Sequence, residues 1–182
     1  TDPNTPNKEF APEGWHVPSD AEWTTLENYL ITNGYNYDGT TTGNKIGKAM
    51  ASTTGWNSST EPGAVGNDQS LNNSSGFNAF PEGARYTETA NYGNGSFDNV
   101  GRYAFFWSST ETSADYAWYR DLVNDLSRLG RASSYSGDGK PFGFSVRFVR
   151  NSEANSNAQV NPVSDQIFCS GEDVIVYFST IN

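Results

Sequence analysis

The segment 143–150 constrains the fold most, because it has the clearest strand pattern in the chain. Its apolar and polar side chains alternate as in a strand with one buried and one solvent-facing side, in the order Phe144, Ser145, Val146, Arg147 and Phe148. Three aromatic-rich stretches, 103–110, 116–122 and 127–135, precede this segment and are separated by short polar turns. We therefore predict one antiparallel sheet that ends with this strand and organises the fold.

Composition predicts a loop-rich domain whose core is built largely from aromatic rings. The chain has 182 residues, enough for one sizeable core, and 14% of them are aromatic although only one is methionine. Its 18 glycines and its Ser, Asn and Thr runs indicate many loops and short strands. No stretch approaches the roughly 18 consecutive apolar residues of a membrane span, so we expect no membrane insertion.

The acidic charge of the chain argues against nucleic acid as a partner. The formal net charge is −10 at pH 7, whereas phosphate binding requires a positively charged surface. The segment 120–150 differs, since its six basic and three acidic residues give it a charge of +3. These basic residues are either solvated and paired groups at strand edges or part of a cationic binding site. Cys169 is the only cysteine, which excludes a disulfide or a cysteine-rich zinc site within the chain.

The start of a helix is the strongest local signal. Ser19 is followed three residues later by Glu22, which is the spacing of a capping box. An apolar stripe then continues through Trp23, Leu26 and Leu30. We predict a helix over 19–32, a weaker helix over 42–51, and a long polar loop over 57–75 that is either functional or mobile.

Four ordered blocks, 14–23, 76–79, 106–111 and 143–150, resemble the Fibrobacter succinogenes major paralogous domain family. The helix start and the last block resemble formylglycine-generating enzymes more distantly, and those proteins have a variant of the C-type lectin fold. The resemblance implies an α+β, lectin-like domain with one or two helices against a small antiparallel sheet. It also implies a secreted or surface-displayed bacterial protein.

The chain divides into four parts in this interpretation. An extended leader covers 1–13, the lectin-like domain 14–151, and an Asn/Ser/Ala-rich linker 152–161. The segment 162–182 resembles the opening of an immunoglobulin-like repeat of Bacteroidota surface proteins. We expect such a partial β segment to pack on the first domain or on another chain, because it cannot bury a core of its own.

An enzyme is the function that the sequence supports least. The only histidine, His16, lies at the entry to the first helix, where a structural hydrogen bond is the expected role. The nearest pair of carboxylates, Asp20 and Glu22, is explained by helix capping. Formylglycine-generating enzymes depend on a cysteine pair near the end of their domain, whereas Cys169 lies beyond it, so that activity does not carry over.

Calcium is a possible ligand of the oxygen-rich loops. Carboxylates, amides and carbonyls are the ligands that calcium takes, and they recur around Asp68 and Asp98. We take these two residues as the candidate metal ligands. The alternative is that the Asn, Asp and Gly residues only form turns.

The candidate ligand-binding region contains exposed rings and cations. Trp118 and Tyr119 are neighbours in a predicted strand, so they point to opposite faces and both cannot enter one core. With Arg128, Arg131 and Tyr135, one ring forms a polar aromatic surface suited to a glycan or another extracellular polymer. We therefore predict a non-enzymatic adhesin-like recognition domain of a secreted or surface protein.

Three alternatives to this binding function stay open. In the first alternative, packing or loops cover both faces of the strand that contains Trp118 and Tyr119, so that no ligand binds. The domain is a structural module of a surface filament or large repeat protein, and its partners are neighbouring domains or other subunits. The segment 113–140 is a diversified ligand loop, which one sequence does not test.

Overall fold

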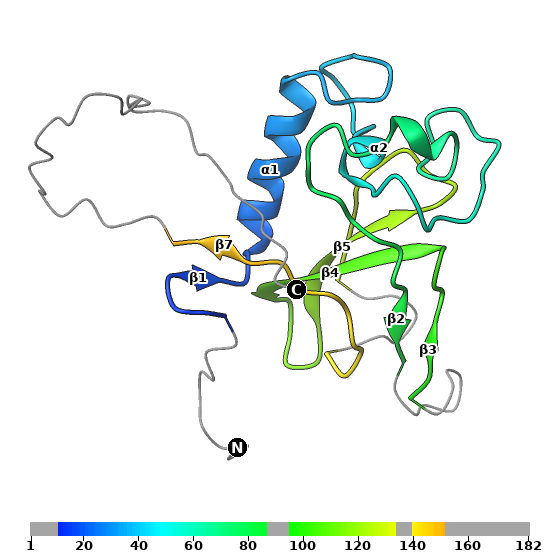
Figure 1. Ribbon diagram of the computed structural model, residues 1–182. Coiled ribbons are helices and arrows are strands. Elements are labelled where there is room, and N and C mark those ends of the chain that lie inside the picture. The colour runs from blue at the N-terminus through cyan, green and yellow to red at the C-terminus, as the bar shows by residue number, and fades with distance from the viewer. Residues whose placement is uncertain (1–10, 87–94, 134–139, 152–182) are drawn as a thin grey trace, which may run out of the picture.

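The computed structural model describes residues 11–86, 95–133 and 140–151, and its main elements are a single long helix and a three-stranded antiparallel sheet (Figure 1). The helix is α1 (Asp20–Thr32), and the sheet has the order β4 (Tyr103–Glu111), β5 (Ala117–Val123) and β6 (Gly130–Ala132). Two short pairs accompany the sheet: β1 (Trp15–His16) with β7 (Val149–Arg150), and β2 (Ala84–Arg85) with β3 (Phe97–Asp98). The remaining elements are α2 (Gly47–Met50) and the 3-10 helix η1 (Gln69–Leu71).

The structure has the few helices and small antiparallel sheets that were predicted, an architecture compatible with the α+β class or with a mostly β fold. The first helix is also confirmed, because α1 begins at Asp20 with Ser19 as its N-cap. The capping box is complete: the Glu22 N–H donates to Ser19 Oγ, and the Ser19 N–H donates to Glu22 Oε2 at 2.8 Å. No helix among the described residues combines the length and the apolar content needed to cross a membrane.

The prediction that 143–150 forms the last strand of the sheet is wrong. Only Val149–Arg150 is a strand, and it pairs with β1. Ser145 instead forms a parallel bridge with Phe106, in which the Trp107 N–H donates to the Ser145 carbonyl at 3.1 Å. An alternating pattern predicts an extended backbone, but it does not specify which strand lies beside it. Here the ring of Phe144 packs against the rings of β4.

The second predicted helix is shorter than expected. It covers Gly47–Met50 rather than 42–51. The backbone N–H of Gly47 donates to the Ser127 carbonyl at 2.7 Å, and a Cβ on Gly47 would lie 2.7 Å from the same oxygen. The helix start is therefore set by close contact with a distant loop, because only glycine allows this approach.

The two faces of the β4–β5–β6 sheet pack into different clusters. The face toward α1 belongs to the larger core, in which the Trp23 ring lies 5.9 Å from both Phe77 and Phe106. The opposite face carries a second, aromatic cluster centred on Phe105 and Tyr119. Neighbouring strand residues alternate between these clusters, since β-strand side chains point to opposite faces. We call them the helix face and the aromatic face.

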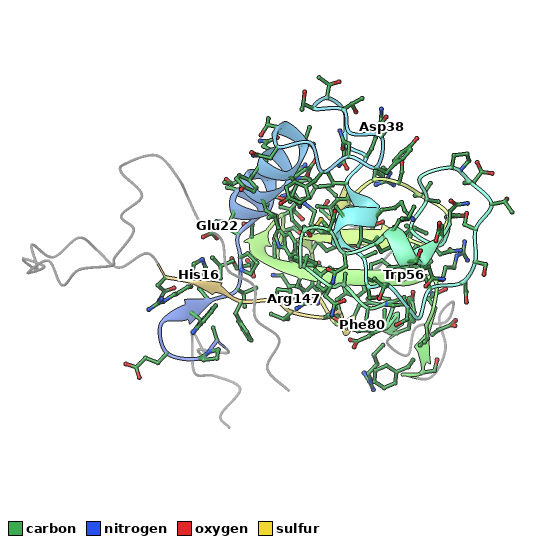
Figure 2. All side chains as sticks on the ribbon, turned by 45° about the horizontal axis from the view of Figure 1, so that its top comes forward. His16, Glu22, Asp38, Trp56, Phe80 and Arg147 are labelled. Carbon is green, nitrogen blue, oxygen red and sulfur yellow. The ribbon has the colours of Figure 1, made fainter. Side chains whose placement is uncertain are left out.

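Residues near the start of α1 tie both ends of the domain together (Figure 2). His16 Nε2 lies 2.7 Å from Glu22 Oε1, and His16 Nδ1 lies 2.6 Å from Asn151 Oδ1. Burial lowers the pKa of His16, but the hydrogen bonds to Asn151 and Glu22 outweigh it and raise this pKa above its usual 6.5. His16 thus makes the structural hydrogen bonds that its position predicts.

Candidate binding site

A cavity of about 600 Å³ lies over the aromatic face of the sheet. Its aromatic lining comes from Tyr86, Tyr103, Phe105, Tyr119 and Phe144. Its charged lining comes from β3, β5, β6 and the loops around them: Asp98, Arg102, Asp121, Asp125, Arg128 and Arg131. A concave site with rings and a few converging polar groups has the composition typical of a small-ligand pocket.

The rings of the cavity form a stacked row. The Tyr103 and Phe105 rings are 5.0 Å apart at 7°, and the Phe105 and Phe144 rings are 4.5 Å apart at 13°. Phe144 also stacks on Trp107 at 4.5 Å, while the Arg102 guanidinium lies 5.1 Å from the Tyr103 ring centre. Because the ring faces largely cover one another, the row supplies a rigid apolar wall more than an open stacking platform.

Asp121 is the most unusual polar group in this wall. It is partly buried in the middle of β5, and its carboxylate accepts no hydrogen bond from any described residue. Burial raises the pKa of Asp121, although Arg128 and Arg120 oppose this shift. A carboxylate placed in this way retains unused acceptor capacity inside the cavity.

Gly130 makes the room that Asp121 occupies. The two residues are cross-strand partners, and a Cβ on Gly130 would lie 2.1 Å from Asp121 Oδ1 and 2.5 Å from Arg128 Nη1. The carboxylate and the guanidinium therefore both approach the bare Cα of Gly130. Any larger residue at this position must displace both of them.

The structure separates the predicted ligand residues. Tyr119 and Arg128 border the cavity, although Tyr119 is only 2% exposed and belongs to the aromatic cluster. Trp118 is directed to the other face, where the Arg131 guanidinium lies 3.5 Å from its ring centre. Tyr135 lies outside the described residues. Trp118 and Tyr119 therefore point to opposite faces of the sheet, as predicted.

Arg131 borders the cavity, but its guanidinium binds Asp20 on the helix face. Arg131 donates from Nε and Nη2 to the two carboxylate oxygens of Asp20 at 2.9 and 2.8 Å. Arg120, whose side chain is 0% exposed, donates to the same carboxylate at 2.7 Å and to Thr24 Oγ1 at 3.1 Å. These arginines, Arg131 first, lower the pKa of Asp20. Asp20 therefore anchors α1 to the sheet, in addition to its place in the first turn of the helix.

Other cations of the 120–150 segment are also engaged. Lys140 pairs with Glu111 at 2.6 Å. Arg147 is buried, with its guanidinium 4.9 Å from the Phe77 ring centre and a hydrogen bond to the Asn78 carbonyl at 3.1 Å. The local charge of +3 does not form a free cationic surface at these residues.

The two predicted metal ligands are not brought into a cluster. Among the described residues, no group of three or more His, Cys, Asp or Glu side chains is positioned to hold a metal ion. Asp98 borders the cavity and accepts a hydrogen bond from the Asn99 N–H at 2.6 Å. Asp68 Oδ1 accepts from Ser70 Oγ at 2.6 Å. Calcium binding at either residue stays a prediction.

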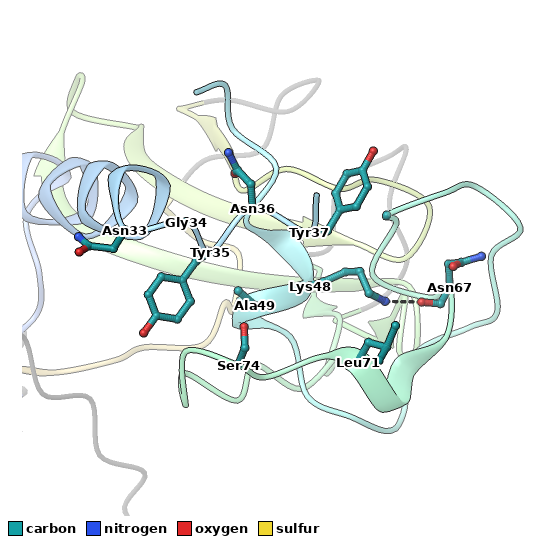
Figure 3. A pocket seen from close by; sticks show the side chains of 11 residues that line it. Asn33, Gly34, Tyr35, Asn36, Tyr37, Lys48, Ala49, Asn67, Leu71 and Ser74 are labelled. Atoms are coloured by element: carbon teal, nitrogen blue, oxygen red, sulfur yellow. Dashed lines mark hydrogen bonds between the residues drawn. The ribbon is translucent and has the colours of Figure 1, made fainter. Parts of the chain in front are cut away.

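A second cavity, of about 410 Å³, lies between the end of α1, α2 and η1 (Figure 3). Lys48 reaches across it and donates to the backbone carbonyls of Asn67 and Asp68, the latter at 3.0 Å. Burial lowers the pKa of Lys48, while Asp68 opposes the shift. The ammonium group of Lys48 thus holds the loop through these carbonyls. It is therefore not free to bind a ligand in this cavity.

The long polar loop 57–75 is held by side-chain hydrogen bonds in addition to the buried Ala64 and Val65. Gln69 exchanges two hydrogen bonds with the Trp56 backbone at 3.1 and 2.8 Å. Asn72 Nδ2 donates to the carbonyls of Ser52 and Val65 at 2.9 and 3.1 Å. This loop needs no ligand to explain its order, because its amide side chains satisfy the backbone.

Sequence reasoning missed Asp121 and the Tyr103–Phe105–Phe144 row as site residues. A weak signal was present in the sequence, since the charged pair Arg120 and Asp121 interrupts an otherwise apolar strand. The role of Gly130 depends on the strand register and was not visible before the strands were paired.

Comparison with known proteins gives one family. The family model of the Fibrobacter succinogenes major domain matches residues 3–150, which confirms the resemblance to that family. No match was found among curated proteins or among solved structures.

Proposed function

This chain belongs to the Fibrobacter succinogenes major domain family, and we propose that it is a non-enzymatic recognition domain of a secreted or cell-surface bacterial protein. Its ligand is a glycan or another extracellular polymer. The cavity over the aromatic face carries this proposal, because it combines apolar rings with the carboxylate of Asp121, which accepts no hydrogen bond from the described part of the chain. Such a combination suits a ligand that has both apolar and hydroxyl surfaces.

The cavity supports binding more than catalysis. A pair of catalytic groups needs a base and an acid, or a base and a nucleophile, within hydrogen-bond reach. The only histidine, His16, is bound to Glu22 and Asn151. The charges that act on the Asp121 carboxyl come from Arg128 and Arg120, which supply fixed positive charge and no base, although Asp98 and Asp125 also line the cavity.

A glycan array tests the proposed function. Wild type is compared with an Asp121→Asn, Arg128→Ala double variant and with Asp115→Asn, in which an exposed carboxylate outside the cavity is neutralised. We expect wild type and Asp115→Asn to bind the same glycans and the double variant to lose them. A blank array for the wild type contradicts glycan recognition.

A structural module is the second candidate, and exposed apolar side chains favour it. Phe97 is 74% exposed, Val100 67% and Phe80 45%. The Gly101 N–H donates to the Pro81 carbonyl at 2.8 Å, which keeps the segments of Val100 and Phe80 together. Exposed apolar side chains of this size suit contact with a neighbouring subunit or domain. Ordered filaments in electron micrographs, together with a blank array, decide for this function.

Three finer proposals accompany the main one. The fold is of the C-type lectin-like, formylglycine-generating-enzyme type, and the segment 162–182, outside the described residues, begins an immunoglobulin-like repeat. Calcium bound through Asp68 or Asp98 stabilises loops without taking part in chemistry. Bound calcium raises the melting temperature by mass action, so identical melts in calcium and in chelator contradict it.

A further inference from the structure

We propose that the cavity over the aromatic face recognises a neutral sugar ring, with adjacent hydroxyl groups bound by Asp121 and Arg128 together. This inference rests on the proposed glycan-binding function and names the class of glycan. The geometry that carries it is the approach of the Asp121 carboxylate and the Arg128 guanidinium, which form no ion pair within the described residues, to the same glycine, Gly130.

A cationic segment would favour acidic glycans. The guanidinium groups of Arg120 and Arg131 are bound to Asp20 on the helix face. Within the cavity, Arg102 lies over the Tyr103 ring, and Arg128 faces Asp121. Three carboxylates also line the cavity, namely Asp98, Asp121 and Asp125. The site therefore lacks the excess positive charge that uronate or sulfate recognition requires.

Two opposite charges lie close together in the cavity. Asp121 and Arg128 form no ion pair within 4.0 Å among the described residues, yet both lie against Gly130. A ligand with a single charge of either sign meets a like charge at this point. A hydroxyl group meets none, because it donates to a carboxylate and accepts from a guanidinium. Two neighbouring hydroxyl groups satisfy both residues at once.

Aromatic rings form the apolar part of the cavity. The wall formed by Tyr103, Phe105 and Phe144 is rigid because its members are stacked on one another. It supplies an apolar surface for the C–H groups of a sugar ring, and the polar pair sets the orientation of that ring. Orientation by fixed polar groups on rigid strands costs little ordering on binding.

Gly130→Ala is the sharpest test, because it moves the polar pair without changing any charge. The Cβ displaces only the ends of the Asp121 and Arg128 side chains, so the fold should persist. Neutral oligosaccharides derived from mannan, xylan and β-glucan serve as probes, beside oligogalacturonate and heparin as acidic probes. Melting curves confirm that each variant is folded, and Asp115→Asn is the control for charge.

We expect wild type to bind a neutral probe with a Kd that changes less than about twofold between low and high salt, since no net charge is neutralised. Asp121→Asn and Gly130→Ala should each weaken this binding about 10- to 100-fold, the usual effect of losing a hydrogen bond to a charged group. Asp115→Asn should leave it unchanged.

Each other result overturns the inference in a distinguishable way. Binding of the acidic probes alone, with strong salt dependence, overturns neutral recognition but keeps the proposed glycan function. Neutral binding that survives both Asp121→Asn and Gly130→Ala places the sugar elsewhere on the domain. A wild type that binds neither class removes the proposed function together with this inference.

Discussion

The two faces of the β4–β5–β6 sheet treat charge in opposite ways. On the helix face, the fully buried Arg120 and its partner Asp20 are bound to each other and to groups of α1. On the aromatic face, one residue further along β5, Asp121 is partly buried without a hydrogen bond from a described residue. Since folding favours satisfied polar groups, the first arrangement serves stability and the second is a cost that binding can offset.

The aromatic residues of the two faces also differ, in how deeply they are buried and in how their rings pack. On the helix face, Trp23, Phe77 and Phe106 meet at tilted or edge-on angles and are 1–4% exposed. On the aromatic face, Tyr103 and Phe144 are only partly buried and border a cavity. Substitutions on the helix face should therefore change stability, and substitutions on the aromatic face should change binding.

The largest effect is expected from Trp23→Ala. Trp23 is 1% exposed and packs against Phe77 and Phe106, so its removal leaves a large cavity. We expect a loss of about 3–5 kcal/mol in the free energy of unfolding, measured by denaturant titration. Tyr29→Ala on the exposed side of the same helix is the control and should cost within about 0.5 kcal/mol. If Trp23→Ala and Tyr29→Ala cost the same free energy of unfolding, Trp23 is not a central residue of the core.

Asp20→Ala comes next. It leaves the 0% exposed Arg120 side chain without its carboxylate partner. We expect a loss of about 3 kcal/mol, because an uncompensated buried charge is costly. Arg131→Ala removes only the 43% exposed partner of the same carboxylate and should cost less than about 1 kcal/mol. If Arg131→Ala costs as much as Asp20→Ala, the burial of Arg120 is not the cause.

Local and non-local information explain what the sequence could predict. α1 was predictable because its cap, Ser19 with Glu22, and its apolar stripe lie within one helix. The place of Phe144 was not, because stacking on Phe105 and Trp107 depends on segments almost 40 residues apart.

The candidate site depends even more on contacts between segments that are distant in the sequence. The opposite directions of Trp118 and Tyr119 follow from strand geometry alone. Which of them faces the helix depends on the tertiary fold. The sequence around Arg131 is the same whether this residue binds a ligand or Asp20. Only the fold, which brings Asp20 of α1 to Arg131, distinguishes the two roles. Asp121 gains its character from Gly130, its partner in β6.

A pH effect at the edge of the helix face is smaller than either substitution. The His16 pKa is raised in the folded state by Asn151 and Glu22, against the lowering effect of burial. The stabilisation is therefore complete below the usual pKa of 6.5 and is lost as pH rises through the folded-state pKa. His16→Gln should flatten this part of the stability profile. His16 is the only histidine, so one NMR titration measures its pKa directly; a value at or below 6.5 contradicts the prediction.

Asp121→Asn gives the smallest expected change in stability, and its sign is opposite to those of the helix-face substitutions. Burial raises the Asp121 pKa above its usual 3.8, with Arg128 and Arg120 opposing the shift, while Asp98 and Asp125 also line the cavity. The folded state therefore holds the proton more tightly than the unfolded state. Wild type loses stability as pH rises from 3.8 through the folded-state pKa, whereas the amide does not titrate.

The melting temperature of Asp121→Asn should thus match wild type near pH 3.5 and exceed it slightly at pH 7, a range that brackets the usual pKa of 3.8. Asp115→Asn, on an exposed loop, provides the matched control and should show no such divergence. A variant that is less stable than wild type at pH 7 would show that the Asp121 carboxylate stabilises the fold. The aromatic face would then resemble the helix face, and the case for Asp121 as a binding group would fail with it.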